Sequence, residues 1–82
     1  MIKVKFTPEI RDQLLVWLHT NVDANSRPDY KPNHSSWLNK TTTWRSQRTL
    51  WLLTQNDYKQ ILEIECFDPI HETRIKDLFF DS

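Results

Sequence analysis

The stretch that decides the fold is residues 51–66, WLLTQNDYKQILEIEC. Apolar residues recur at alternate positions on both sides of Asn56-Asp57, and this period of two is typical of half-buried β-strands. Asn and Asp tolerate positive φ and are common in tight turns. The pattern therefore predicts a β-hairpin with strands at 42–54 and 58–67 joined by a two-residue turn.

A two-residue turn fixes which residues of the two strands lie opposite one another. Trp51 is expected opposite Leu62, and Arg48 is expected opposite Glu65 as a cross-strand ion pair. The same register gathers one apolar face, made of Trp51, Leu53, Leu62, Ile64 and Cys66. Because a slip of one residue would scatter this face, the alternation and the turn support the same hairpin.

Three further elements and a loop are expected outside the hairpin. Residues 2–6 alternate apolar and charged side chains, as a strand does. Helices are expected at 8–22 and from Asp68-Pro69 onward, because each start combines a capping side chain with a proline suited to the first turn. Residues 23–41 contain two prolines and many Asn and Ser residues, so they predict a long loop.

The expected order of elements is β-α-(long loop)-β-β-α, which belongs to the α+β class. A small, mostly antiparallel three-stranded sheet with two helices packed on one face would bury the apolar residues. The length of 82 residues predicts a single domain over 1–82 with a modest core. Four Trp, four Phe and two Tyr residues are large enough to build that core.

Composition excludes several classes of function. Eleven basic and eleven acidic residues balance, which argues against an acidic nucleic-acid mimic and against a generic basic nucleic-acid coat. Glycine is absent, so Walker-type and dinucleotide-binding loops are excluded. The three histidines lack metal-ligand spacing, so neither a metal nor another cofactor is expected. The single cysteine, Cys66, is expected to be a buried structural thiol.

The sequence contains no apolar run typical of a membrane span or a signal peptide. A cytoplasmic protein without membrane contacts is therefore expected. Ala24 is the only alanine, and both alanine and glycine use GC-rich codons. Their scarcity suggests an AT-rich genome such as that of a phage, in which case the compartment is the host cell cytoplasm.

Residues 27–51 combine five basic residues and one acidic residue with three tryptophans. This combination is typical of proteins that bind single-stranded nucleic acid, because cations contact phosphates and aromatic rings stack on bases. The acidic arm of the hairpin could also neutralise the same charges internally. The candidate partner-binding residues are Arg27, Tyr30, Lys31, Trp37, Lys40, Trp44, Arg45 and Arg48.

Two aromatic positions predict contacts with a partner. Trp44 lies seven residues before Trp51 in one expected strand, so the two rings are expected on opposite faces. If Trp51 is buried, Trp44 is either an exposed anchor for a partner or is covered by the long loop. Phe79 and Phe80 are adjacent on the second helix and cannot both face the core, so one is expected to be exposed or to pack in a homodimer.

Three functions remain open at this point. The preferred hypothesis is a non-catalytic protein that binds and modulates another macromolecule, most simply a protein, as a phage or mobile-element inhibitor of a host or defence protein would. The first alternative is a nucleic-acid-binding module that uses residues 27–51. The second is a small ribonuclease-like toxin with His34, Arg45 and a nearby carboxylate as an acid–base set, although nothing in the sequence brings these groups together.

Overall fold

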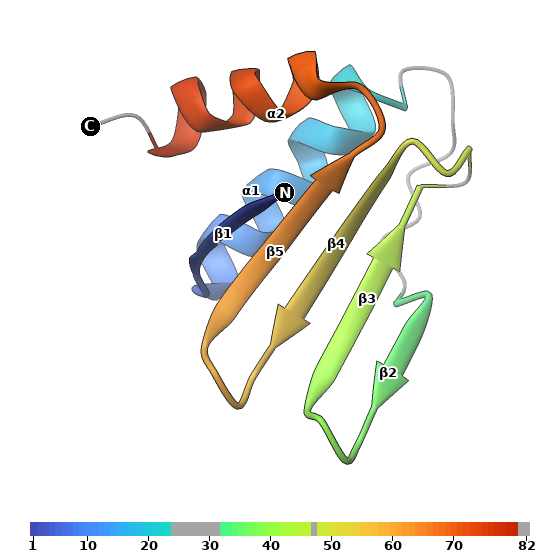
Figure 1. Ribbon diagram of the computed structural model, residues 1–82, viewed down its shortest axis with the longest axis vertical. Helices are drawn as coiled ribbons and strands as arrows, with labels where there is room; N and C mark the ends of the chain where they lie inside the picture. The colour runs from blue at the N-terminus through green and yellow to red at the C-terminus, as the bar shows by residue number, and fades with distance from the viewer. Residues whose placement is uncertain (24–31, 47, 81–82) are drawn as a thin grey trace.

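The computed structural model describes residues 1–23, 32–46 and 48–80. The elements in chain order are β1 (Ile2–Lys5), α1 (Pro8–Asn21), β2 (His34–Ser36), β3 (Thr41–Arg45), β4 (Trp51–Asn56), β5 (Ile61–Cys66), α2 (Pro69–Ile75) and a π-helical segment, η1 (Lys76–Phe80). The strands form one antiparallel sheet in the order β1-β5-β4-β3-β2. Figure 1 shows α1 against one face of this sheet and α2 at the end where β5 finishes.

The α+β class is confirmed, but the sheet has five strands where three were expected. Residues 42–54 were expected to form one strand, and they contribute to two, β3 and β4. Ser46 ends β3 by closing a turn: its side-chain oxygen accepts from the Arg48 amide at 3.1 Å, and its carbonyl accepts from the Thr49 amide at 3.0 Å. Thr49 has φ of 60°, a left-handed conformation that reverses the chain.

One of the additional strands, β2, lies within the expected loop at 23–41. Residues 34–36 of that segment form β2, which pairs with β3 at the edge of the sheet. Residues 24–31 of the expected loop lie outside the described residues. A strand of three polar residues has no apolar alternation, so the sequence pattern could not separate it from a loop.

The turn between β4 and β5 has four residues, 57–60, rather than two, and this shifts the expected register. Trp51 lies opposite Cys66 instead of Leu62. Because the partner changes by an even number of residues, each side chain keeps its face. The expected apolar face is therefore confirmed: Trp51, Leu53, Leu62, Ile64 and Cys66 are all buried.

The expected ion pair between Arg48 and Glu65 is wrong for the same reason. Leu52, not Arg48, is the cross-strand partner of Glu65. Arg48 lies in the connection between β3 and β4 and is exposed.

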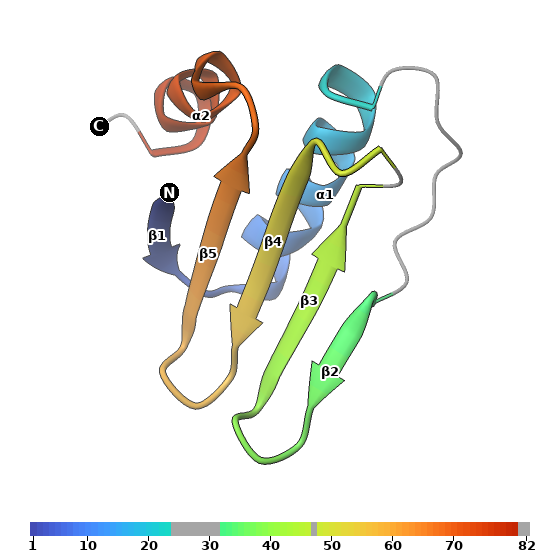
Figure 2. The same cartoon turned by 45° about the vertical axis from the view of Figure 1, so that its right-hand side comes forward.

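Both helices begin as expected. The Thr7 hydroxyl accepts from the Ile10 amide at 3.1 Å at the start of α1, and the Asp68 carboxylate accepts from the Ile70 amide at 3.0 Å at the start of α2. The helices supply Leu14, Leu18 and Ile75 to the core, where they are fully buried with Leu53, Leu62 and Ile64. In Figures 1 and 2, no described helix covers the opposite face of the sheet, which we call the outer face.

The side chains of the outer face follow from strand alternation and register. They include Lys3 on β1, Glu63 and Glu65 on β5, Leu52 and Thr54 on β4, Thr43 and Arg45 on β3, and His34 on β2. Most of these residues are polar, as expected for a sheet face in contact with water.

Candidate functional site

Trp44 is a core residue and not an exposed anchor, and the expectation that it lies on the face opposite Trp51 is wrong. Its side chain is 7% exposed, and it lies opposite Leu53 on the covered face of the sheet. Counting seven residues from Trp44 to Trp51 predicts opposite faces only if both lie in one strand. A turn separates the two residues, and both rings lie on the same face. The Arg11 guanidinium of α1 lies 5.8 Å from the centre of the Trp44 ring. Trp44 therefore packs between sheet and helix.

The other candidate residues do not form one surface. Trp37 and Lys40 lie in the turn between β2 and β3, at the lower end of the sheet in Figure 1. Arg45 and Arg48 lie at the opposite end, where β3 finishes. The remaining three candidates, Arg27, Tyr30 and Lys31, lie outside the described residues.

The lower end of the sheet carries the two most exposed large apolar side chains among the described residues. Trp37 is 93% exposed and Leu38 is 96% exposed, and both lie in the β2–β3 turn. Tyr58, in the β4–β5 turn, is also largely exposed. The two turns are neighbours, because the Asp57 amide donates to the Lys40 carbonyl at 2.8 Å. We call this region the hairpin-tip surface and define it by Trp37, Leu38, Lys40, Tyr58 and Lys59.

The two turns of the hairpin-tip surface are built alike. In the first, the Ser36 side chain at the end of β2 accepts from the Asn39 amide at 3.4 Å. In the second, the Asn56 side chain at the end of β4 accepts from the Lys59 amide at 2.8 Å. Such side-chain caps hold four-residue turns in a defined conformation. The exposed side chains therefore project from an ordered backbone.

Each turn also ends in a residue with positive φ. Lys40 has φ of 48° and Gln60 has φ of 57°. Glycine is the residue that adopts this conformation most readily, but the chain contains none. Because the turn geometry needs a left-handed residue, larger side chains occupy these positions despite the steric cost.

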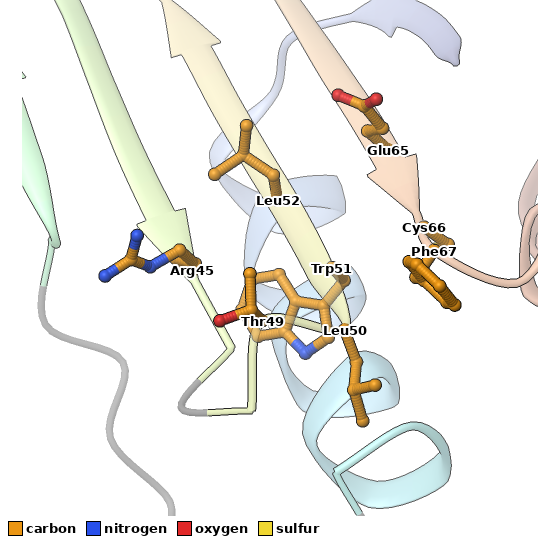
Figure 3. Close-up of a pocket in the computed structure, with 8 residues that line it drawn as sticks. All are labelled: Arg45, Thr49, Leu50, Trp51, Leu52, Glu65, Cys66 and Phe67. Carbon is orange, nitrogen blue, oxygen red and sulfur yellow. The ribbon is translucent and has the colours of Figure 1, made fainter.

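A second candidate site lies at the upper end of the sheet, on the outer face. A pocket of about 360 Å³ is lined by Arg45, Thr49, Leu50, Trp51, Leu52, Glu65, Cys66 and Phe67. Figure 3 shows Arg45 and Glu65 on either side of Leu52, with Phe67 beside the end of β5. The Phe67 amide donates to the Leu50 carbonyl at 2.9 Å, which continues the pairing of β4 with β5 beyond the strand ends. We call this site the strand-end pocket.

His34 and Arg45 lie on the same face of neighbouring strands, which the sequence could not establish. His34 lies opposite Thr43 on the outer face, and Arg45 is two residues further along β3. This is a diagonal cross-strand arrangement, in which long side chains can reach one another. Glu65 lies on the same face, two strands away from Arg45.

A buried polar cluster that the sequence did not reveal supports the strand-end pocket from beneath. Asp23, just after α1, accepts hydrogen bonds from the Ser46 hydroxyl at 2.7 Å and from the Trp51 indole at 2.6 Å. All three residues are buried. The cluster holds the β3–β4 connection against the helix, so its role is structural.

Cys66 belongs to the core, and the C-terminal phenylalanines Phe79 and Phe80 pack against it. Burial, followed by the nearby carboxylate of Glu72, raises the pKa of the Cys66 thiol to about 11, so little nucleophilic thiolate forms near neutral pH. Phe79 and Phe80 are both half-buried against the core, with ring centres 6.1 Å apart. Neither ring is exposed, so the alternative of an exposed ring is wrong, whereas packing in a homodimer stays a prediction.

Across residues 1–23, 32–46 and 48–80, no group of three His, Cys, Asp or Glu residues could hold a metal ion. No helix among these residues is long and apolar enough to cross a membrane.

Comparison with known proteins finds no matching family model, no matching curated protein and no matching solved structure.

Proposed function

We propose that this chain is a non-catalytic binding protein that modulates another macromolecule, and that its partner is a protein that contacts the hairpin-tip surface. The observation that carries the proposal is the exposure of Trp37 and Leu38, which exceeds nine-tenths for both side chains. Large apolar side chains this exposed on an ordered turn are typical of interaction sites.

The energetic argument rests on Trp37. A tryptophan can bury roughly 150–250 Å², which at about 25 cal/mol per Å² gives roughly 4–6 kcal/mol before the costs of association. Side-chain caps already order the two turns, so less conformational entropy is lost when a partner binds. A pocket of about 280 Å³ beside Trp37 offers room for a side chain of the partner.

The charges of the surface indicate the chemistry of the partner. The two turns carry two lysines, Lys40 and Lys59, and one acidic residue, Asp57. The matching partner surface is an apolar pocket for Trp37 with an acidic rim.

A protein partner fits this surface better than nucleic acid does. Base stacking along a strand needs several exposed rings next to cations. Trp44 and Trp51 are buried, and Arg45 lies at the other end of the sheet from Trp37. The described part of the segment that is basic and Trp-rich in sequence, residues 32–46 and 48–51, is therefore divided between the core and two separate ends of the sheet.

The glycine-free composition adds a proposal about origin. An AT-rich genome, such as that of a phage or mobile element, would encode few glycines and alanines. Small proteins without catalytic groups can act there by occupying a host or defence protein stoichiometrically. We therefore propose inhibition of such a protein as the form that the modulation takes.

The test is capture of the partner with a Trp37→Ala/Leu38→Ala double variant. The tagged wild-type chain is expected to retain a defined protein from a nuclease-treated host extract, and the double variant to lose it. Loss of one tryptophan anchor alone should weaken the affinity of the purified complex by about 30-fold or more, which corresponds to about 2 kcal/mol. Phe67→Ala, which removes an exposed ring at the other end of the sheet, is the matched control.

Two results would contradict the proposal. Undiminished binding of the partner to the double variant would exclude the hairpin-tip surface. Loss of capture on nuclease treatment would replace the protein partner by a nucleic acid.

A further inference from the structure

Two opposite charges, Arg45 and Glu65, flank the apolar side chain of Leu52 in the strand-end pocket. Arg45 and Glu65 are the two cross-strand neighbours of Leu52, and all three residues lie on the outer face. Figure 3 shows the Arg45 guanidinium extending away from Leu52, so it must turn toward Leu52 to contact a ligand in the pocket. Neighbouring strands lie about 4.8 Å apart, so the backbones of Arg45 and Glu65 are roughly 10 Å apart. Within the described residues neither side chain forms an ion pair.

An aromatic ring borders the same pocket. Phe67 follows β5 directly and is 85% exposed. Its backbone is held by the hydrogen bond to Leu50, so the ring stands on an ordered segment. On the opposite side, the pocket is lined by Thr49, whose backbone adopts the left-handed conformation. Arg45, Glu65 and Phe67 thus line one open pocket.

We propose that the strand-end pocket binds a guanine nucleotide. Its phosphate is held by Arg45, its base stacks on Phe67, and Glu65 accepts hydrogen bonds from the base edge. This site is separate from the hairpin-tip surface, because it lies at the opposite end of the sheet.

The ligand follows from the chemistry of the three groups. A guanidinium binds phosphate through paired, charge-assisted hydrogen bonds. An aromatic side chain beside a positive groove stacks on unpaired bases. The phosphate and the base edge lie at opposite ends of a nucleotide, as Arg45 and Glu65 lie on opposite sides of the pocket. The volume of about 360 Å³ is within the range of small-ligand sites.

Glu65 selects among the bases. Its ionised carboxylate offers only acceptors, and it binds best to two donors that point the same way. The Watson–Crick edge of guanine presents an adjacent imino N–H and amino group, which match the two oxygens. The edges of uracil, cytosine and adenine each place at least one acceptor against the carboxylate. Guanine is therefore the expected base.

The outer face also indicates where a longer strand would run. From Arg45 it continues over Thr43 to His34, and neither β2 nor β3 contains an acidic residue. A free nucleotide and a nucleotide within a single strand share the same recognition chemistry, so the experiment must separate the two sources.

The test is titration of the purified chain with GMP, AMP, CMP and UMP, followed by nuclear magnetic resonance and calorimetry. GMP is expected to bind most tightly, with shifts at Arg45, Leu52 and Phe67. Arg45→Ala and Phe67→Ala should each weaken GMP binding at least about tenfold, which is the size of one lost stacking or phosphate contact. Glu65→Gln should remove the preference for guanine, because an amide carries only one acceptor.

Arg48→Ala is the matched control, because Arg48 is an exposed arginine of the adjacent β3–β4 connection that does not line the pocket. It should leave GMP binding unchanged. A uridine pentamer with one central guanosine separates the two sources. A single strand is identified if the pentamer binds more tightly than GMP and if Arg45→Ala reduces, by about 0.7, the slope of log binding constant against log salt concentration. Affinity for GMP equal to or above that for the pentamer identifies the free nucleotide.

Three outcomes would overturn the proposal. They are absence of nucleotide binding at millimolar concentration, equal affinity for all four nucleotides, and GMP binding that survives both Arg45→Ala and Phe67→Ala. A zwitterionic dipeptide that binds in the pocket when GMP does not would reassign the site to a peptide. None of these results affects Trp37 and Leu38, so the proposed protein partner is tested independently.

Discussion

The carboxylate of Asp23 accepts a hydrogen bond from the indole nitrogen of Trp51 at 2.6 Å, and this contact joins the end of α1 to the start of β4. The other carboxylate oxygen accepts a hydrogen bond from the hydroxyl of Ser46, the residue that follows β3. A buried charge is tolerated when its oxygens receive such donors. The contact therefore fixes the connection that forms one wall of the strand-end pocket.

Asp23→Ala is expected to lower the free energy of unfolding by about 3 kcal/mol, because it removes two charge-assisted hydrogen bonds and leaves two buried donors unpaired. Urea unfolding followed by circular dichroism measures the loss. Asp12→Ala is the control, because Asp12 is exposed and pairs with Arg11 on the helix surface, an interaction worth less than about 1 kcal/mol. Equal losses in the two variants would show that the buried cluster adds nothing to stability.

The two faces of β4 should respond differently to the same substitution. Leu53 is fully buried between Trp44 and Ile64, so Leu53→Ala should cost about 3 kcal/mol of unfolding free energy. Leu52→Ala, on the outer face, should cost less than about 1 kcal/mol. Urea unfolding of both variants checks this difference. A larger loss for Leu52→Ala than for Leu53→Ala would mean that Leu52, and not Leu53, faces the core. The strand-end pocket would then not lie on the outer face.

The sequence predicts which side chains of the central hairpin are buried, but it does not predict their partners. Alternation assigns Leu53 and Ile64 to the core face whatever the length of the turn, because only an odd shift changes the face. The pairing depends on the turn, and Asn56-Asp57 suggested two residues where the structure uses four. The residue with positive φ in this turn is Gln60, and in a chain without glycine the composition gives no reason to expect it there.

The candidate site was harder to predict for a related reason. The turn at Ser46 divides one expected strand into two, and this single change moves Trp44 from an exposed position into the core. No Gly, Pro or Asn marks that turn in the sequence. By contrast, the caps at Thr7 and Asp68 could be predicted, because helix starts depend on local side-chain chemistry.

Thr49→Gly is expected to stabilise the fold by about 0.5–1 kcal/mol. Thr49 has a β-branched side chain at φ of 60°, where contact between Cβ and the backbone costs roughly 1–2 kcal/mol. Glycine removes that cost, and the greater freedom of the unfolded chain offsets part of the gain. Thermal unfolding of Thr43→Gly, in the middle of β3, provides the comparison, and there glycine should destabilise. A loss of stability in Thr49→Gly would contradict a left-handed residue at this turn.

Cys66 should make the stability of the chain depend on pH in the alkaline range. Burial, and secondly the Glu72 carboxylate, raises the pKa of its thiol from 9.0 to about 11. The unfolded chain therefore releases the thiol proton at a lower pH than the folded chain does. The stabilising contribution is complete below pH 9 and is lost as the pH rises from 9 to about 11. Urea unfolding across this range, compared with Cys66→Ser, isolates the contribution of the thiol.

The same pKa difference predicts the reactivity of Cys66. Near pH 8 the folded chain should contain about a hundredfold less thiolate than the unfolded chain, since two pKa units separate them. Reaction with an aromatic disulfide reagent should be slower by at least that factor, because burial also restricts access. A Cys66→Ser/Thr20→Cys chain carries its only thiol on the exposed surface of α1 and should react like a free thiol. Equally fast reaction of Cys66 in the folded chain would mean that the end of β5 opens readily and that the strand-end pocket lacks a rigid wall.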